Sequence, residues 1–174
     1  MNLNTKIFFK INNLVGRNKW LDAFGRAGAE FVIVGMLGWY AASAFVDRRP
    51  DWKDVAWPII FLAGAWLVAW LINIIIGEIV KEPRPHLTYP EAKLLFTPMM
   101  SWKSFPSDHA MSAFLIFFMA VIFNLPGAEM LLGLALWVSW GRVYSGVHYP
   151  LDVLGGLAVA VLVAGAGYLV LLRL

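Results

Sequence analysis

Residues 153–172 read VLGGLAVAVLVAGAGYLVLL, a run without a single charged side chain. An α-helix rises 1.5 Å per residue, so about 20 apolar residues are enough to cross the hydrocarbon core of a bilayer. Four more apolar stretches of helical length precede this one, at 30–46, 57–80, 107–125 and 130–144. They are continuous rather than alternating, which favours helices over the strands of a membrane barrel. The sequence therefore predicts five spanning helices.

The composition agrees with a membrane protein. Of the 174 residues, 60% are hydrophobic and 14% are charged, whereas a soluble domain carries about 25% charged residues. These values exclude a disordered chain and a coiled coil, and they argue against a soluble fold. The length suits a single domain over 1–174. The absence of cysteine excludes a thiol nucleophile, and a net charge of +3 from scattered basic residues gives no sign of a nucleic-acid partner.

The first 28 residues follow a different pattern. Their apolar side chains occur at helical spacing with basic residues between them, namely Ile7, Phe8, Ile11, Leu14 and Val15 with Lys6 and Lys10. This segment is too short and too charged to span, and we expect it to lie in the membrane interface as an amphipathic helix. The predicted fold is thus an all-α integral membrane bundle of six helices, five spanning and one over 1–28 at the interface.

Polar residues gather in three clusters at the ends of the predicted spans. The clusters read KEPRPH at 81–86, FPSDH at 105–109 and RVYSGVHYPLD at 142–152. If the five spans cross in turn, the long loop 81–106 and the short connection 145–150 lie on the same membrane face. Ionisable residues at such positions are functional candidates by default. We therefore predict one site where the three clusters meet, with 81–106 as its active-site loop.

The second and third clusters contain groups suited to acid–base and nucleophilic chemistry. His148 and Asp152 are four residues apart, so a near-helical backbone puts them on one face, where the carboxylate accepts a proton from one ring nitrogen. The other nitrogen is then left as a nucleophile. His109 has no such partner in its own segment and suits proton donation to a leaving group. We take these three as the candidate catalytic residues.

The remaining polar residues suit an anion. Arg84 and Arg142 can bind phosphate oxygens in a bidentate manner. Ser107 is the expected N-cap of the helix that follows it, and the free N–H groups of the first turn favour an anion. Asp108 either favours that helix N-terminus through the dipole or belongs with the phosphate-binding set. His86 either is an interfacial polar neighbour of the site or touches substrate.

The order and spacing of these motifs resemble those of the type 2 phosphatidic acid phosphatase family, in Arg84-Pro85, then Pro106-Ser107-Asp108-His109, then Arg142, His148 and Asp152. The resemblance implies a phosphatase that needs neither a metal nor a cofactor. It implies that His148 attacks phosphorus to form a phosphohistidine, that His109 protonates the leaving oxygen, and that Asp152 orients His148. It also implies that Arg84, Ser107 and Arg142 hold the phosphate.

Two positions depart from the family pattern. The family places a lysine seven residues before its first-motif arginine, and this chain has Gly77 there. Lys81 lies one helical turn further on, and we include it in the predicted phosphate-binding set because it could supply the missing charge. The third motif usually opens with Ser-Arg and here opens with Gly141-Arg142, which removes a hydroxyl contact.

Within the family, the form FPSDH, the segment HYPLDVLGG at 148–156 and the amphipathic N-terminus resemble bacterial undecaprenyl-diphosphate phosphatases. The resemblance implies hydrolysis of the diphosphate lipid carrier of peptidoglycan synthesis, in the bacterial inner membrane. Phosphatidylglycerophosphate and phosphatidate phosphatases are alternatives with the same core. A non-catalytic phospholipid-binding or transport-associated membrane protein is the alternative of another class, although a binder could dispense with His148 and Asp152. Nothing in the sequence bears on the oligomeric state.

Two arguments about orientation disagree. Most of the 14 Lys and Arg residues fall on the predicted motif face, which by the positive-inside rule places that face in the cytoplasm. Recycling of a lipid carrier implies instead that the active site lies on the extracytoplasmic face. Because the site and the interfacial segment account for much of this basic charge, we follow the resemblance.

Overall fold

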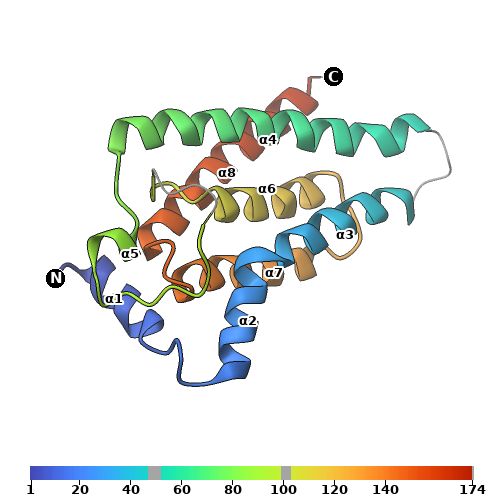
Figure 1. Ribbon diagram of the computed structural model, residues 1–174. Coiled ribbons are helices and arrows are strands. Elements are labelled where there is room, and N and C mark those ends of the chain that lie inside the picture. Colours follow the sequence, from blue (N-terminus) through green and yellow to red (C-terminus); the bar gives the residue numbers. More distant parts are fainter. Residues whose placement is uncertain (47–51, 99–102, 174) are drawn as a thin grey trace.

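The fold is entirely helical in the part of the chain that the computed structural model describes, which is residues 1–46, 52–98 and 103–173. Figure 1 shows the helices in chain order. Their bounds are α1 (Leu3–Asn12), α2 (Lys19–Glu30), α3 (Val32–Val46), α4 (Trp52–Val80), α5 (Pro85–Thr88), α6 (Asp108–Ile122), α7 (Ala128–Tyr144) and α8 (Pro150–Leu171). The prediction of an all-α protein is confirmed.

Helix α6 occupies the centre of the bundle. It packs against α3, α4, α7 and α8, and Figure 1 shows it between α4 and α7. Its side chains Met111, Leu115, Ile116 and Met119 are each at most 1% exposed. Within a bilayer such contacts stabilise the bundle through close packing, because lipid tails are as apolar as the side chains themselves. The outer helices are therefore arranged around α6.

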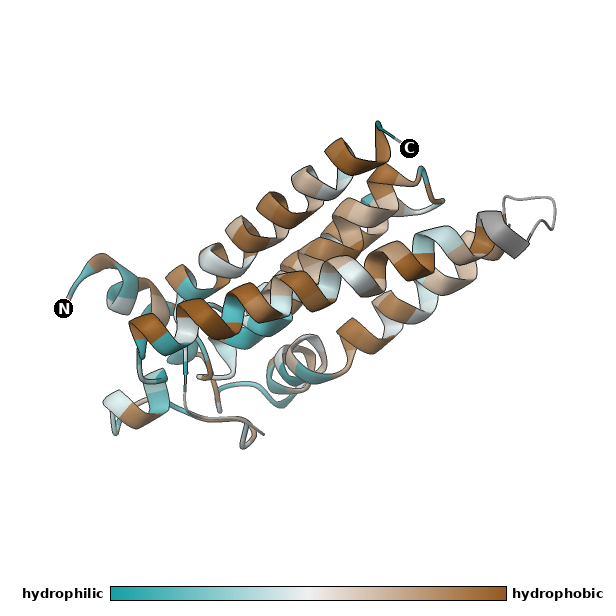
Figure 2. Ribbon diagram, turned by 90° about the horizontal axis from the view of Figure 1, so that it is seen from above, coloured by the Kyte–Doolittle hydropathy of each residue, from teal (hydrophilic) through white to brown (hydrophobic). Residues whose placement is uncertain are grey.

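The outer helices present apolar side chains outward. Along α4, the exposed fractions lie between 50% and 76% for Ile60, Leu67, Val68, Ile75 and Ile79. Figure 2 shows apolar residues along the long helices and hydrophilic residues concentrated toward the end of the bundle that holds the N-terminus. Soluble monomers rarely expose contiguous apolar surfaces of this size, and a bilayer is the solvent that suits them. The protein is a multi-pass integral membrane protein.

The long helices differ in how well each could cross a membrane alone. Two segments are long and apolar enough to cross a membrane, Val55–Thr88, which contains most of α4, and Pro150–Leu171, which is α8. Helices α2 and α3 are long and apolar enough only if they are taken together as one span, which is bent by 52° where they meet. Helices α6 and α7 have 15 and 17 residues. These findings refer to the described residues, and the crossing of five spans stays a prediction.

The N-terminal segment differs from the prediction, because it forms two helices rather than one. A turn at Gly16, whose φ is +81°, separates α1 from α2. The Asn18 side chain then caps α2 by accepting the N–H of Trp20 at 2.8 Å. A glycine with positive φ followed by an asparagine N-cap is a sufficient local reason for the break.

Helix α2 packs closely on α7 rather than standing apart from the bundle. Glycines make the contact possible, since a Cβ at Gly141 would lie 2.7 Å from the backbone nitrogen of Ala29, and one at Gly25 would lie 2.3 Å from the ring of Tyr144. Small residues let helix backbones approach in this way. An amphipathic pattern shows which side chains are apolar but not which backbones touch, so the sequence interpretation missed this contact.

Helix α1 is anchored at the end of the bundle where the motif clusters lie. Phe8 packs edge-on against Tyr149, with ring centroids 5.5 Å apart. Asn12 is fully buried, and its side-chain amide donates 2.8 Å hydrogen bonds to the carbonyl oxygens of Lys93 and Tyr144. Its carbonyl oxygen accepts the N–H of Lys93, also at 2.8 Å. These contacts fix α1 to the segment 89–98, which belongs to the predicted active-site loop.

The three motif clusters meet at this end. The first follows α4 and includes α5, the second leads into α6, and the third joins α7 to α8. Figure 1 shows α1 and α5 beside the start of α8 at the same end. Residues 99–102 of the predicted active-site loop 81–106 lie outside the described residues.

Candidate active site

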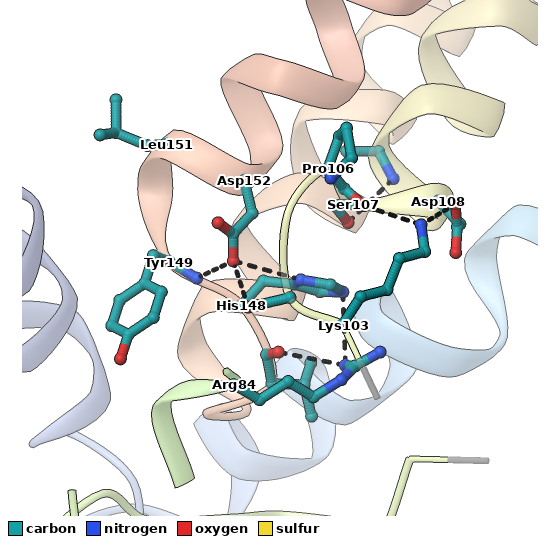
Figure 3. A network of polar contacts seen from close by, with 12 residues as sticks. Arg84, Lys103, Pro106, Ser107, Asp108, His148, Tyr149, Leu151 and Asp152 are labelled. Atoms are coloured by element: carbon teal, nitrogen blue, oxygen red, sulfur yellow. Dashed lines mark hydrogen bonds and ion pairs between the residues drawn. The ribbon is translucent and has the colours of Figure 1, made fainter. Parts of the chain in front are cut away.

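The start of α8 places a histidine and a carboxylate against each other. Tyr149 is the N-cap of α8, and Asp152 Oδ2 accepts its N–H at 2.7 Å. This contact turns the carboxylate back toward His148, whose Nδ1 is 3.4 Å from Asp152 Oδ2 (Figure 3). The Ser104 hydroxyl donates to the same oxygen at 2.5 Å. The buried carboxylate of Asp152 is therefore held in one orientation, facing the ring of His148.

The neighbours of His148 determine which ring nitrogen is available. Arg84 donates from Nη1 to the carbonyl oxygen of Val147 at 3.1 Å, and the same nitrogen is 3.4 Å from His148 Nε2. Because a guanidinium can only donate, Nε2 faces it with its lone pair, and the ring proton belongs on Nδ1 toward Asp152. Burial, together with the positive charges of Arg142 and Arg84, holds the pKa of His148 well below its ordinary value. The imidazole is thus neutral with a nucleophilic nitrogen at Nε2.

A cavity of about 280 Å³ opens in front of His148. Its walls come from the end of α2, the start of α6, the end of α7 and the segments on either side of α5. The residues that line it are Glu30, Arg84, Phe96, Thr97, Pro98, Asp108, His109, Arg142 and His148. The structure therefore brings five of the predicted site residues to one cavity. A sixth, Asp152, lies behind His148, outside the lining.

Arg84 and Arg142 are each held at the cavity by a hydrogen bond from Nη1 to a backbone carbonyl oxygen. Arg142 Nη1 donates to the carbonyl oxygen of Ala29 at 3.0 Å, and the guanidinium carbon lies 5.6 Å from the centre of the Phe96 ring. Among the described residues, neither Arg84 Nε nor Arg142 Nε has a hydrogen-bond partner, and both atoms are buried. Buried donors without partners are costly. Both guanidinium groups line the cavity and keep donor capacity that no described residue uses.

The start of α6 has the geometry that the sequence predicts. Ser107 is its N-cap, and the Ser107 hydroxyl accepts the N–H of Ala110 at 3.5 Å. The Ser107 side chain is fully buried and is not among the residues that line the cavity. The first-turn N–H groups of Asp108 and His109 have no partner within the helix. These two N–H groups, rather than the Ser107 hydroxyl, are the donors that the start of α6 offers to an anion.

The close approach of α8 to this turn depends on a glycine. A Cβ at Gly156 would lie 2.6 Å from the carbonyl oxygen of Ser107 and 2.9 Å from the nitrogen of Met111. The N–H of Ser107 donates to the carbonyl oxygen of Asp152 at 3.0 Å. The second and third motifs are therefore connected directly through their backbones.

The departure at Gly141 has a structural reason. A side chain there would meet Ala29 and Gly25 of α2, whose backbone atoms lie 2.7 and 2.8 Å from an added Cβ. A serine at this position would push α2 away from α7. The end of α2 contributes Glu30 to the cavity and the carbonyl that holds Arg142. Gly141 therefore lacks the serine hydroxyl of the family pattern but lets α2 pack closely against α7.

Lys81 of the first cluster and Lys103, which lies just before the second cluster, differ in their placement. Lys81 is exposed at the end of α4 and is not among the residues that line the cavity. Lys103 is 3% exposed, and its Nζ lies 2.8 Å from Asp108 Oδ1. Asp108 Oδ1 also accepts from the side-chain amide of Asn73 at 2.8 Å. The cation that the structure brings next to the cavity is Lys103 rather than Lys81.

Several residues at the site were missed by the sequence interpretation. They are Glu30 and Phe96 in the cavity wall, Lys103 beside Asp108, and Ser104 against Asp152. Ser104 and Lys103 directly precede the FPSDH motif, and this proximity was the one available signal. Glu30 and Phe96 carry no local signal, because their roles depend on where α2 and the segment 89–98 pack. His86, in α5, does not line the cavity.

Comparison with known proteins agrees with the three motifs. The family model of the PAP2 superfamily matches residues 55–174. The chain belongs to this superfamily. The family resemblance drawn from the motifs is thereby confirmed, and the matched region contains every predicted site residue.

Two individual relatives from Bacillus show which members of the superfamily the chain is similar to. It is 31% identical over 162 residues to the undecaprenyl-diphosphatase BcrC of Bacillus subtilis (strain 168), covering 92% of this chain and 80% of that protein. It is 36% identical over 106 residues to a Bacillus licheniformis protein named bacitracin transport permease protein BcrC, covering 61% of this chain and 52% of that one. The alignment thus spans about half the length of the second relative.

Among solved structures, LpxE of Aquifex aeolicus superposes on this PAP2 chain with a TM-score of 0.73 and 25% sequence identity. The superposition covers 96% of this chain and 95% of that one. The likeness therefore includes the N-terminal helices, which lie outside the region that the family model matches.

Proposed function

We propose that this PAP2 protein is an integral-membrane lipid phosphatase that hydrolyses undecaprenyl diphosphate to undecaprenyl monophosphate and inorganic phosphate. The observation that carries the proposal is the setting of His148, with Nδ1 toward Asp152 and Nε2 toward Arg84 at a cavity that also holds Arg142 and His109. The choice of lipid rests on the printed name of the Bacillus subtilis relative.

In the first step, Nε2 of His148 attacks the terminal phosphorus. The bond from phosphorus to the bridging oxygen breaks, and undecaprenyl monophosphate leaves. Positive charge develops on the ring as the nitrogen–phosphorus bond forms, and Asp152 stabilises it through Nδ1–H. His109 protonates the leaving oxygen where that oxygen needs it. The product of this step is a phosphohistidine.

In the second step, water attacks the phosphohistidine. His109 accepts a proton from the water, and the nitrogen–phosphorus bond breaks, so inorganic phosphate leaves and His148 returns to its neutral state. If His109 gave up a proton in the first step, the proton from water restores its initial state. If it gave none, it releases the proton from water to solvent before the next cycle.

The phosphate oxygens are held by donors rather than by a metal in this proposal. The guanidinium groups of Arg84 and Arg142 line the cavity, and the N–H groups of the first turn of α6 add two more donors. Ser107 supports them as the N-cap of that turn. Within residues 1–46, 52–98 and 103–173, no group of three or more His, Asp and Glu could hold a metal ion. That the reaction needs no metal or cofactor stays a prediction.

The proposed location is the bacterial inner membrane, with the active site on the extracytoplasmic face. The substrate is a membrane lipid, and the lipid bilayer surrounds the outer helices. Single-cysteine variants at positions 50 and 95 would test the orientation, because no native cysteine interferes with labelling by an impermeant thiol reagent. Labelling of position 95 alone on intact spheroplasts is expected. Labelling of position 50 alone would place the site in the cytoplasm.

Phosphate release by the detergent-purified protein tests the activity. A panel of undecaprenyl diphosphate, phosphatidylglycerophosphate and phosphatidate separates the alternatives of the same class. Undecaprenyl diphosphate is expected to give the highest kcat/KM. Release from phosphatidylglycerophosphate or phosphatidate alone would reassign the substrate. No release from any lipid phosphate would favour the non-catalytic alternative, a phospholipid-binding or transport-associated protein.

A further inference from the structure

Lys103 is a buried lysine beside the cavity. Its side chain is 4% exposed, and Nζ lies 2.8 Å from Asp108 Oδ1 and 3.3 Å from the carbonyl oxygen of Pro106. Figure 3 shows Lys103 reaching across the entry to α6 toward Asp108. Lysine is almost never this buried unless it is paired. The ammonium group also lies at a helix N-terminus, where the macrodipole disfavours positive charge. Asp108 and the carbonyl oxygen of Pro106 thus hold a cation at a position that the helix dipole disfavours.

Asp108 is the negative group that compensates this cation. Its Oδ1 is 2.8 Å from both Lys103 Nζ and Asn73 Nδ2. Its side chain is 24% exposed and lines the cavity. A carboxylate is an acceptor without a proton to donate, so Asp108 would contact phosphate oxygens through its backbone N–H and not through its side chain. The carboxylate instead stands between Lys103 and the space that a phosphate would fill.

The other acidic groups near the cavity are already engaged. Asp152 accepts from Ser104 and from the N–H of Tyr149. Glu30 pairs with Arg26 at 2.5 Å. Asp108 is therefore the cavity-lining carboxylate that contacts Lys103. A phosphate in the cavity would bring a second anion to the same end of α6.

The first motif lacks the lysine that the family places before its arginine. Gly77 stands where the family has lysine, and it lies one helical turn from Asn73, the α4 residue that contacts Asp108. Residues four apart share a helix face. Position 77 and Lys103 therefore approach the start of α6 from α4 and from the preceding loop, respectively.

We propose that Lys103 is a phosphate-binding residue and that Asp108 is its counter-ion in the empty site. When a phosphate enters, the ammonium group shares its protons with a phosphate oxygen. Asn73 keeps the Asp108 carboxylate in place. This inference rests on the proposed function, because it assigns a further ligand for the phosphate group of that same substrate.

Competitive inhibition by inorganic phosphate tests the assignment, measured with the full-length protein in detergent. A charge-assisted hydrogen bond is worth about a 10- to 100-fold change in affinity. Lys103→Met should raise both the inhibition constant of phosphate and KM by about 10-fold or more, and Lys103→Arg should recover most of the loss. The matched control is Lys6→Met, an exposed lysine on α1, which should change neither constant. An unchanged inhibition constant in Lys103→Met would overturn the proposal.

Asp108→Asn adds a readout that a purely structural lysine would not move. Removing the counter-ion should lower the inhibition constant of phosphate when Lys103 is present and should have no such effect in the Lys103→Met background. Equal effects of Asp108→Asn in both backgrounds would contradict the assignment. If Lys103→Met does not fold, Asp108→Asn alone still tests the proposal. An inhibition constant of phosphate that is unchanged or raised in Asp108→Asn would show that Asp108 does not compete with phosphate for Lys103. A loss of affinity in Lys81→Met without one in Lys103→Met would assign the role to Lys81.

Different measurements test the proposed function and the assignment of Lys103. If the wild-type protein releases no phosphate from any lipid, the proposed function is wrong. The lysine assignment is then decided by calorimetric binding of inorganic phosphate to the wild-type protein and to Lys103→Met. Equal binding by the two proteins would refute it, and weaker binding by the variant would support it.

Discussion

The motif end of the bundle and its apolar body are held together by different kinds of contact. In the body, α6 is surrounded by aliphatic and thioether side chains such as Leu115 and Met119, and volume-conserving substitutions in such packing are tolerated. At the motif end, directional hydrogen bonds replace such packing, and Asp152 Oδ2 accepts both the Ser104 hydroxyl and the N–H of Tyr149. Such contacts require particular donor and acceptor atoms at particular positions, so substitutions there should be tolerated far less than in the body.

The largest expected effect is that of His148→Ala. Because no phosphohistidine can form without this ring, hydrolysis of lipid and aryl phosphates should fall by at least about 10⁴-fold alike. The matched variant in the body is Leu169→Ala on α8, whose side chain is 62% exposed, and its rate should equal that of the wild type. Phosphate release reports both. Residual turnover by His148→Ala on either substrate would assign the nucleophile elsewhere.

His109→Ala should have a smaller effect that depends on the leaving group. General acid catalysis contributes about 10²–10⁴-fold, and an alkoxide needs the proton more than a nitrophenolate or a lipid phosphate does. The variant should therefore lose much more rate on an alkyl monophosphate than on an aryl phosphate, provided that chemistry limits the rate. Phosphoenzyme trapped by acid quench with the aryl substrate would support the second role, as base. Equal losses on both substrates, with no trapped phosphoenzyme, would remove His109 from the mechanism.

Arg142→Lys keeps the charge at the motif end and changes its geometry. The planar guanidinium donates to the carbonyl oxygen of Ala29 while it lines the cavity, and lysine cannot reproduce this arrangement. The loss of kcat/KM in Arg142→Lys should approach the loss in Arg142→Ala, at roughly 10²-fold or more. A lysine variant with most of the wild-type activity would show that charge alone is enough.

The pH profile should show the effect of the buried surroundings of His148. Its pKa lies well below the ordinary value because of burial and the two arginines, so the ring stays neutral as the pH falls through about 6.5. After correction for ionisation of the free substrate, the acid limb of kcat/KM should lie below pH 6.5. Removing one positive neighbour in Arg84→Met should shift that limb to higher pH. A wild-type limb at 6.5 that Arg84→Met does not shift would contradict this account.

The smallest expected effect is that of a chelator. If arginines and backbone N–H groups hold the phosphate, EDTA should leave the rate of phosphate release unchanged. Added Mg²⁺ should not increase the rate either. Complete loss of turnover in EDTA, restored by a divalent ion, would show that the donor set of this site needs a metal.

Much of the candidate site could be predicted because its residues lie in short motifs. His148 and Asp152 are four residues apart at a helix start, and Ser107 precedes a helix as its N-cap. Local spacing determines such relations. Lys103 was overlooked because its importance depends on Asp108 and on Asn73 of α4, which lies 35 residues away from Asp108 in sequence. The sequence offers Lys81 for the charge missing at Gly77, but Lys81 lies just beyond the end of α4 and does not line the cavity, whereas the lysine next to Asp108 comes from the loop before α6.

The helical membrane fold, the three motifs and the family could be predicted because apolar periodicity and motif spacing are local properties. The break of 1–28 into two helices, with α2 packed through Gly25 and Gly141 on α7, became visible only in the folded chain. The same holds for Glu30 and Phe96 in the cavity wall and for the pairing of Lys103 with Asp108. The physical reason is that these contacts depend on how closely two helix backbones approach, which is set by packing across the whole bundle and not by the order of residues in any one segment.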